Sequence, residues 1–331
     1  MTDNPVTHGG NLDEALLRFG GTASEWIDLS TGINPYSYPF KPPAQHAYTA
    51  LPTAAVISGL EKQAQHYYQT SLACCAVSGA QSAIQLLAQY CSTNYRTVSI
   101  LSPTYNEYQR AFSHIGMQTT LTADLHSLQQ AEIAILCSPN NPTGQLISIE
   151  QIEQLAQQVQ LVILDESFAD CMAAPTILNQ LASSVNNIVS LRSFGKFFGL
   201  AGLRLGFILG APQMISILRD FAGPWPVSGV AADIAVQAFA DHHWQEQTRD
   251  ELNRLAQISD RLAADAGWRH EGGCALFRLY AVQDSSTAQQ VLAYHHIWSR
   301  IFEYNPHWIR LGTPHDQHLQ RLEKAFTALH G

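Results

Sequence analysis

Residues 193–196 read Ser-Phe-Gly-Lys, and Arg204 follows eight positions after the lysine. Upstream, residues 141–144 read Asn-Pro-Thr-Gly, and Asp165 directly follows the apolar run 161–164. A lysine amine can form a Schiff base with an aldehyde, a carboxylate can keep a pyridinium nitrogen protonated, and hydroxyl and guanidinium groups can bind a phosphate. Each group alone is ordinary, since most lysines are solvated and Asn-Pro-Thr-Gly is a common turn. Together, in this order and after apolar runs, they indicate one cofactor chemistry.

Between residues 58 and 210 the sequence alternates helical and strand patterns, which predicts an α/β fold with a mainly parallel sheet. Ser58 with Glu61 forms a capping-box pattern that predicts the start of a helix. Strands are expected at 73–77, 98–101, 133–136, 161–164, 188–191 and 206–209. Most carry a polar motif at the carboxyl end, the edge at which open α/β sheets bind ligands.

The chain has 331 residues, which is long enough for one large domain with a smaller one. After residue 212 the pattern changes to longer helices with short strands, which predicts a second, α+β domain. We expect an N-terminal arm at 1–44 that joins the small domain, a large cofactor-binding domain at 45–225, and a small C-terminal domain at 226–331.

The net charge of −9 argues against a protein that binds nucleic acid without sequence preference. Any anionic ligand must therefore be bound by a few placed cations. With no run of about 18 apolar residues and no signal-like amino terminus, we expect a cytoplasmic protein that does not contact membranes. The six cysteines are scattered without zinc-ligand spacing, so we interpret them as reduced and buried. No metal site is assigned.

The strand-to-helix turn at Ala80 and Gln81 offers main-chain N–H groups and a positive helix end to a phosphate, which Ser193 and Arg204 could also reach. The alternative is a plain turn between a strand and a helix. Tyr105 follows a strand end and could stack on a flat heteroaromatic ring. The alternative is a partly buried core tyrosine.

The Asn141 amide can hydrogen-bond a phenolic oxygen of such a ring and a substrate carboxylate. Asp165 ends a buried run, where a carboxylate without a cation would be costly, and beside a pyridinium it would keep the ring able to accept electrons. Arg310 lies on the short apolar strand 308–311, and its guanidinium suits a carboxylate. The alternative for Arg310 is a structural ion pair.

These residues resemble the aspartate-aminotransferase-like superfamily of fold-type I pyridoxal-phosphate enzymes over essentially the whole chain. The subgroup that it resembles contains histidinol-phosphate aminotransferases and threonine-phosphate decarboxylases. The resemblance implies that Lys196 carries pyridoxal 5'-phosphate as the catalytic residue and that Arg310 binds the amino-acid carboxylate. It also implies a homodimer. The implied cofactor-binding residues are Ala80, Gln81, Tyr105, Asn141, Asp165, Ser193, Lys196 and Arg204.

The opening His-Gly-Gly-Asn at 8–11, with Ile-Asp-Leu-Ser-Thr-Gly-Ile-Asn-Pro at 27–35, resembles threonine-phosphate decarboxylases of cobalamin biosynthesis. This implies decarboxylation of L-threonine O-3-phosphate to (R)-1-aminopropan-2-ol O-2-phosphate. The substrate phosphate needs donors, and we expect them from His8, Gly9, Gly10 and Asn34, with Asn141 and Arg310 on the carboxylate. Alternatively, His8 pins the arm onto the dimer.

Two departures from the aminotransferase pattern matter. Phe168 stands where aminotransferases usually have a tyrosine that bonds the cofactor's phenolic oxygen, and Leu51 stands where a tyrosine usually reaches the partner subunit's phosphate. Two other functions remain open: an aminotransferase for histidinol phosphate or a related amino acid, and a catalytically silent cofactor-binding sensor. The complete set of Lys196, Asp165 and Asn141, with no attached DNA-binding segment, argues against the sensor.

Overall fold

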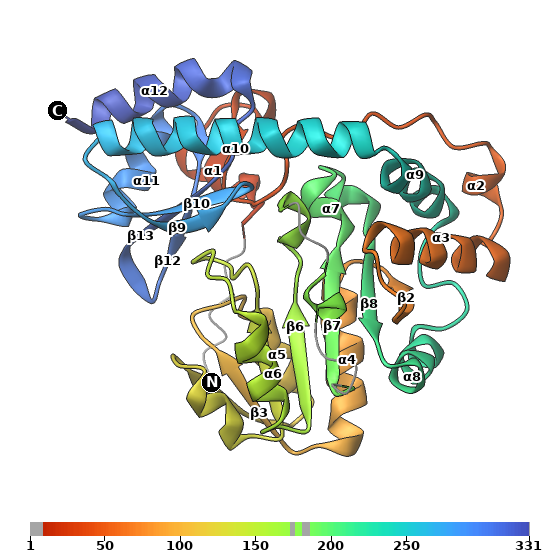
Figure 1. Ribbon diagram of the computed structural model, residues 1–331. Helices are drawn as coiled ribbons and strands as arrows, with labels where there is room; N and C mark the ends of the chain where they lie inside the picture. The colour runs from red at the N-terminus through yellow and green to blue at the C-terminus, as the bar shows by residue number, and fades with distance from the viewer. Residues whose placement is uncertain (1–8, 173–175, 181–185, 331) are drawn as a thin grey trace. The chain divides into compact units, whose positions relative to one another are not determined.

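The computed structural model describes residues 9–172, 176–180 and 186–330 (Figure 1). The chain forms two compact units. The larger unit is Ser37–Arg249, and the smaller unit combines Met1–Tyr36 with Asp250–Gly331. No helix within the described ranges has the length and apolar character needed to cross a membrane.

A seven-stranded sheet with the order β2-β8-β7-β6-β5-β3-β4 forms the centre of the larger unit (Figure 1). The pairs from β7 to β4 are parallel, whereas β8 is antiparallel to both β2 and β7. The mainly parallel α/β sheet that the sequence predicts is therefore confirmed. The strands are β2 Ala73–Val77, β3 Thr97–Leu101, β4 Gln118–Thr122, β5 Ile133–Cys137, β6 Leu161–Asp165, β7 Ile188–Ser193 and β8 Gly206–Gly210.

All six predicted strands of this sheet are present, because each is a largely buried apolar run. β4 was not predicted. It is the polar, mostly exposed strand at the edge of the sheet, and its sequence Gln-Thr-Thr-Leu-Thr lacks the apolar run that marks the others. Edge strands need not be buried on both faces, so composition alone does not reveal this one.

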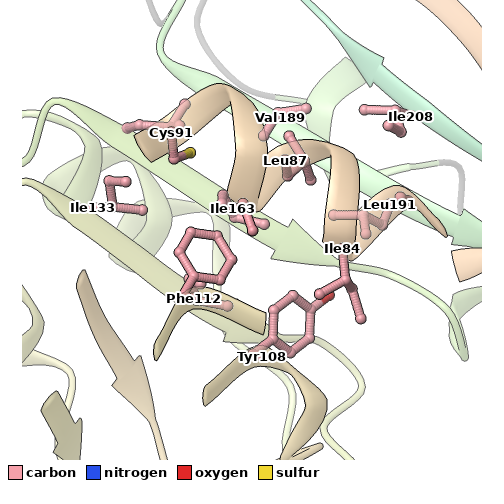
Figure 2. Close-up of a cluster of buried hydrophobic side chains, with 14 of the residues drawn as sticks. Ile84, Leu87, Cys91, Tyr108, Phe112, Ile133, Ile163, Val189, Leu191 and Ile208 are labelled. Carbon is pink, nitrogen blue, oxygen red and sulfur yellow. The ribbon is translucent and has the colours of Figure 1, made fainter. Parts of the chain in front are cut away.

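Alternate residues of β6 belong to two different hydrophobic cores. Leu161 and Ile163 lie in the core that packs against the helices α4 and α5, part of which Figure 2 shows. Val162 and Leu164 lie in the core that contains residues of α6. Because side chains alternate across a strand, Asp165 lies on the same face as Leu161 and Ile163. The carboxylate that ends β6 therefore faces α4 and α5.

The helices of the larger unit are α2 His46–Thr49, α3 Ala54–Tyr67, α4 Ala80–Asn94, α5 Glu107–His114, α6 Ile149–Ala156, α7 Phe194–Phe197, α8 Pro212–Ala222 and α9 Gly229–Ala240. The predicted helix start at Ser58 is wrong, because α3 already begins after Thr53. The Thr53 side chain accepts a hydrogen bond from the Val56 N–H and so caps the helix. Ser58 lies inside the helix.

In the smaller unit, four antiparallel strands have the order β12-β13-β10-β9. They are β9 Arg269–Cys274, β10 Phe277–Ala281, β12 Arg300–Phe302 and β13 Asn305–Gly312. A second, two-stranded sheet pairs β1 Ile27–Asp28 with β11 Ile297–Trp298. The helices are α1 Leu12–Phe19, α11 Ser285–Tyr294 and α12 Leu319–Thr327, while α10 His242–Asp265 runs from the larger unit into this one. Ile27 and Leu29 pack into the core of this unit, so its N-terminal segment is part of the fold.

The units end at other residues than the sequence suggested, since we expected boundaries at 44/45 and 225/226. Residues 37–44 and 226–249 belong to the larger unit. The Tyr38 N–H donates to the Phe198 carbonyl at 2.9 Å, and Phe239 of α9 stacks on Tyr67 at the end of α3 with ring centres 4.6 Å apart. These contacts place both segments in the core of the larger unit.

Candidate active site

The polar residues that follow β5, β6 and β7 lie at one edge of the central sheet. The three strands are adjacent and parallel, with Cys137 of β5 opposite Asp165 of β6. Their carboxyl ends therefore meet at one edge, which carries the turn at 141–144, Asp165 and the segment from Ser193 to Lys196. The strand order thus explains why these groups lie at the same edge of the sheet.

Asp165 is a buried carboxylate that accepts hydrogen bonds from two uncharged donors. It is 6% exposed. Its Oδ1 accepts from the Ser167 N–H at 2.8 Å, and its Oδ2 accepts from the Tyr108 hydroxyl at 2.7 Å. A buried carboxylate is costly unless a cation lies beside it, and a pyridinium nitrogen has the required charge. Tyr108 is a residue of this site that the sequence reasoning missed.

Lys196 lies beside Phe168. Its Nζ is 5.0 Å from the centre of the Phe168 ring, which itself follows Asp165 by three residues. The lysine is on α7, directly after β7, and is partly buried. The preceding Gly195 allows this close turn, because a Cβ there would lie 2.6 Å from the Cα of Ala201. The lysine and the Asp165 strand end are thus neighbours at the sheet edge.

The start of α4 and Arg204 form a site with the geometry of an anion cradle. Gly79 precedes α4 with φ +83°, and a Cβ at this position would lie 2.7 Å from Nη2 of Arg204. Only glycine lets the guanidinium lie this close to the start of α4, where the N–H groups of Ala80 and Gln81 precede the first hydrogen bonds within the helix. Ser193 on β7 lies opposite Gly206 on β8. A Cβ on Gly206 would lie 3.0 Å from the main-chain nitrogen of Ala80, so Ser193 is close to the start of α4.

Tyr105 is held by a short chain of side chains. Its hydroxyl donates to Oε1 of Gln81 at 3.3 Å, and Nε2 of Gln81 donates to Glu107 at 2.6 Å. Burial raises the pKa of Tyr105 to about 12, so its hydroxyl remains a donor. The Gln81 side chain is thereby occupied, which leaves its main-chain N–H as the candidate donor to an anion. Tyr105 also packs against the hydrophobic core, as the core interpretation expects, while its stacking on a ring stays a prediction.

The turn at 141–144 is built by Asn140, which the sequence reasoning did not single out. The Asn140 amide donates to the Pro103 carbonyl at 2.9 Å and to Thr143 at 2.8 Å, and it accepts from Thr104 at 2.7 Å. Asn140 is buried, whereas Asn141 is only partly buried. Asn140 therefore has a structural role in the turn, and Asn141 remains the candidate for binding a ligand.

In the smaller unit, Arg310 lies opposite Arg300 across β12 and β13. Nη2 of Arg310 donates to the Ser30 carbonyl at 2.6 Å, and its guanidinium lies 5.3 Å from the centre of the Phe277 ring. Burial, with Arg300 nearby, lowers the pKa of Arg310 to about 10, which still leaves it charged at neutral pH. Burial also lowers the pKa of Arg300. Two opposed cations repel each other, so the pair favours an anion. Arg300 was not predicted.

The N-terminal segment is tied to Arg310 through Ser30. The Gly10 N–H donates to the Ser30 hydroxyl at 2.7 Å, so this N–H, which we expected to bind substrate phosphate, is already engaged. A Cβ at Gly9 would lie 2.3 Å from the Ser30 carbonyl oxygen, which explains the glycine. Asn34 is 2% exposed and accepts from the Tyr36 N–H at 2.9 Å. His8 lies outside the described residues.

Comparisons with known proteins agree with this geometry. The family model described as aminotransferase class I and II matches residues 25–326. Two relatives named threonine-phosphate decarboxylase, from Sinorhizobium sp. and Pseudomonas aeruginosa, are 35% and 36% identical, each over 94% of this chain and 94% of their own length. A histidinol-phosphate aminotransferase from Sodalis glossinidius is 30% identical over 73% of this chain and 69% of its own.

Solved structures show the same fold. A histidinol-phosphate aminotransferase from Sinorhizobium meliloti, solved in complex with pyridoxal-5'-phosphate, has a TM-score of 0.79 at 19% identity, covering 96% of this chain and 93% of its own. An L-threonine-O-3-phosphate decarboxylase from Porphyromonas gingivalis has a TM-score of 0.73 at 18% identity, covering 91% and 98%. The fold-type I class that the sequence suggested is confirmed.

Proposed function

Because the chain belongs to the aminotransferase class I and II family of enzymes, we propose that it decarboxylates L-threonine O-3-phosphate with pyridoxal phosphate. The product is (R)-1-aminopropan-2-ol O-2-phosphate, and the resemblance of the N-terminal segment suggests a use in cobalamin biosynthesis. One observation carries the choice of reaction: the two relatives from Sinorhizobium sp. and Pseudomonas aeruginosa, each matching 94% of this chain, are named threonine-phosphate decarboxylase. The aminotransferase relative matches 73% of it.

The residues of the larger unit fit the cofactor. Its phosphate has donors in the N–H groups of Ala80 and Gln81 and a counter-charge in Arg204, close to Gly79. Asp165, buried and hydrogen-bonded to the Tyr108 hydroxyl and the Ser167 N–H, suits the ring nitrogen. Lys196 has the amine that can bond the aldehyde carbon. Tyr105 supplies a flat face, and Asn141 and Ser193 supply polar groups at the same edge.

Pyridoxal phosphate, when bound, supplies a cationic ring that withdraws the electron pair released at the substrate's α-carbon. Asp165 keeps that charge on the ring, and Lys196 can carry a proton to or from the reacting carbon. Arg310 holds the substrate carboxylate, so that the bond to be broken has a fixed direction. Loss of that carboxylate as CO₂ and return of a proton to the α-carbon complete the reaction.

The phosphate of the substrate needs a separate set of donors. We propose Arg300, which lies opposite Arg310, together with His8, Asn34 and the Gly9 N–H. A substrate with a carboxylate and a phosphate carries more than one negative charge, which matches two opposed guanidinium groups. The acidic chain offers few other cations, having 18 Lys and Arg against 27 Asp and Glu.

A homodimer and a cytoplasmic location are part of this proposal. Tyr48 and Leu51 are 58% and 63% exposed, and Val56 and Val236 are 41% and 40% exposed. These apolar side chains lie on or beside α2, α3 and α9, and α9 contacts both of the other helices. Such a group of exposed apolar residues suits a second copy of the chain. The six cysteines are all buried and unbridged, as a reducing compartment would keep them.

The test compares the two reactions that this family offers. Purified protein with pyridoxal phosphate is incubated with threonine phosphate, with and without 2-oxoglutarate, and CO₂ and glutamate are measured. Decarboxylation releases CO₂ without the oxoacid and forms no glutamate. Glutamate formation that depends on 2-oxoglutarate, without CO₂, would establish the aminotransferase instead.

A further inference from the structure

Tyr108 is a buried tyrosine that contacts Asp165 and has no role in the reaction described above. It lies in the first turn of α5 and is fully buried beside Ile84 and Phe112 (Figure 2). Its hydroxyl donates to Oδ2 of Asp165 at 2.7 Å. The two residues are 57 positions apart in sequence, so this contact exists only because α5 packs against the sheet face that carries Asp165.

The direction of this hydrogen bond follows from the surroundings of both groups. Burial raises the pKa of Tyr108 well above its usual value, so the hydroxyl keeps its proton and is the donor of the hydrogen bond. Cys137, opposite Asp165 on β5, is also buried, and its raised pKa keeps the thiol neutral. Tyr105 keeps its proton as well. These three titratable neighbours of Asp165 are therefore neutral. The Tyr108 hydroxyl donates to Asp165, whereas the Tyr105 hydroxyl donates to Gln81.

We propose that the Tyr108 hydroxyl is a positioning group that, through its hydrogen bond, fixes the Asp165 carboxylate beside the ring nitrogen of the bound cofactor. A proton shared between a carboxylate and a pyridine nitrogen stays on the nitrogen when the carboxylate anion is stabilised by other donors. The Ser167 N–H stabilises one oxygen, and Tyr108 stabilises the other. The hydroxyl thus acts on the cofactor through Asp165. This inference rests on the proposed cofactor.

The experiment uses Tyr108→Phe, which removes one oxygen atom and leaves the ring in the core. Equilibrium dissociation constants of the full-length apoprotein are measured for pyridoxal phosphate and for 1-deazapyridoxal phosphate, in which a C–H replaces the ring nitrogen. We expect Tyr108→Phe to bind pyridoxal phosphate about ten- to a hundredfold more weakly, the range for a hydrogen bond to a charged group. Binding of the deaza compound should not weaken, because that ring has no nitrogen to protonate.

Two controls separate this role from packing. Tyr90→Phe removes a hydroxyl from another tyrosine that packs against the same core, and it should leave both dissociation constants at their wild-type values. In protein that already carries Asp165→Asn, Tyr108→Phe should no longer change the ratio of the two constants, because the hydroxyl acts through the carboxylate. The ¹⁵N chemical shift of ring-labelled cofactor should move toward the unprotonated value in Tyr108→Phe alone.

An equal loss of affinity for both compounds, or no loss for either, would overturn the inference and leave Tyr108 as a packing residue. A selective loss that persists in the Asp165→Asn background would also overturn it. Failure of the wild-type protein to bind pyridoxal phosphate would instead reject the proposed function. The two claims can therefore fail separately.

Discussion

The Lys196 Nζ lies 5.0 Å from the centre of the Phe168 ring. This contact joins the end of β7, which carries the lysine, to the end of β6, where Phe168 follows Asp165 by three residues. Phe168 is 5% exposed and brings an apolar face but no hydroxyl to the lysine. A phenylalanine here suits a reaction in which the amine of Lys196, rather than a neighbouring phenol, handles the proton at the reacting carbon.

Lys196 is expected to be the lysine that binds the cofactor covalently. The holoprotein should absorb above about 400 nm at some pH, as a protonated Schiff base does, and borohydride should fix the label. Peptide mapping of the reduced protein then identifies the labelled residue. Lys62 and Lys324 serve as internal controls that should stay unmodified. A label on any lysine other than Lys196 contradicts the site described here.

Gly79→Ala is expected to disrupt the cofactor's phosphate site. The new Cβ would lie 2.7 Å from Nη2 of Arg204, so the guanidinium would be displaced from the start of α4. Gly116→Ala is the matched control, because Gly116 has the same φ of +83° but no atom within 4 Å of its Cβ position. Both variants should lose about 1–3 kcal/mol of unfolding free energy from backbone strain.

Only Gly79→Ala should also weaken cofactor binding, by about tenfold or more, because it alone displaces a charged hydrogen-bond donor. Urea denaturation gives the stability, and a fluorescence titration of the apoprotein gives the affinity. Equal cofactor affinities in the two variants would show that Arg204 does not bind the phosphate.

Arg310→Lys should raise KM for threonine phosphate by about tenfold or more, because an ammonium cannot replace the planar fork of a guanidinium. Cofactor affinity should not change. Arg278→Lys is the control on the neighbouring strand β10, where the arginine is paired with Asp260 at 2.6 Å. Steady-state kinetics of both variants checks the prediction. An unchanged KM in Arg310→Lys would place the carboxylate elsewhere.

His8→Ala should weaken the binding of threonine phosphate more than that of threonine, by about 1–3 kcal/mol if a charge-assisted hydrogen bond to the phosphate is lost. Inhibition constants for both compounds, with sedimentation analysis of the variant, test this. If His8 only pins the N-terminal arm onto a dimer, both compounds should lose affinity equally and the dimer should dissociate more readily.

Except for the polar edge strand β4, the strands of the central sheet were predictable because each is a largely buried apolar run, and most carry a polar motif behind it. Asp165 and Lys196 follow from that pattern without knowledge of the packing. Tyr108 does not, since its role depends on where α5 docks. Its spacing of four from Phe112 places both on one helix face, a signal that predicts a core position but no partner.

Arg300 escaped prediction for a related reason. Its strand has only three residues, and its position opposite Arg310 depends on the register between β12 and β13. The unit boundaries were also misplaced, because α9 looks like the start of a new helical region in sequence but packs on α3 of the larger unit. The contact of Tyr108 with Asp165, the position of Arg300 and the unit boundaries all depend on packing between segments that are far apart in the sequence.

The fate of the substrate's carboxyl carbon tests the proposed decarboxylation most directly. Holoprotein is given L-threonine O-3-phosphate labelled with ¹³C at C1, and ¹³C NMR follows the label with no oxoacid present. We predict that the label appears as CO₂ and bicarbonate, in step with formation of 1-aminopropan-2-ol O-2-phosphate, and that Lys196→Ala abolishes this release. A label that stays in the organic carboxylate while the amino group is lost would contradict it.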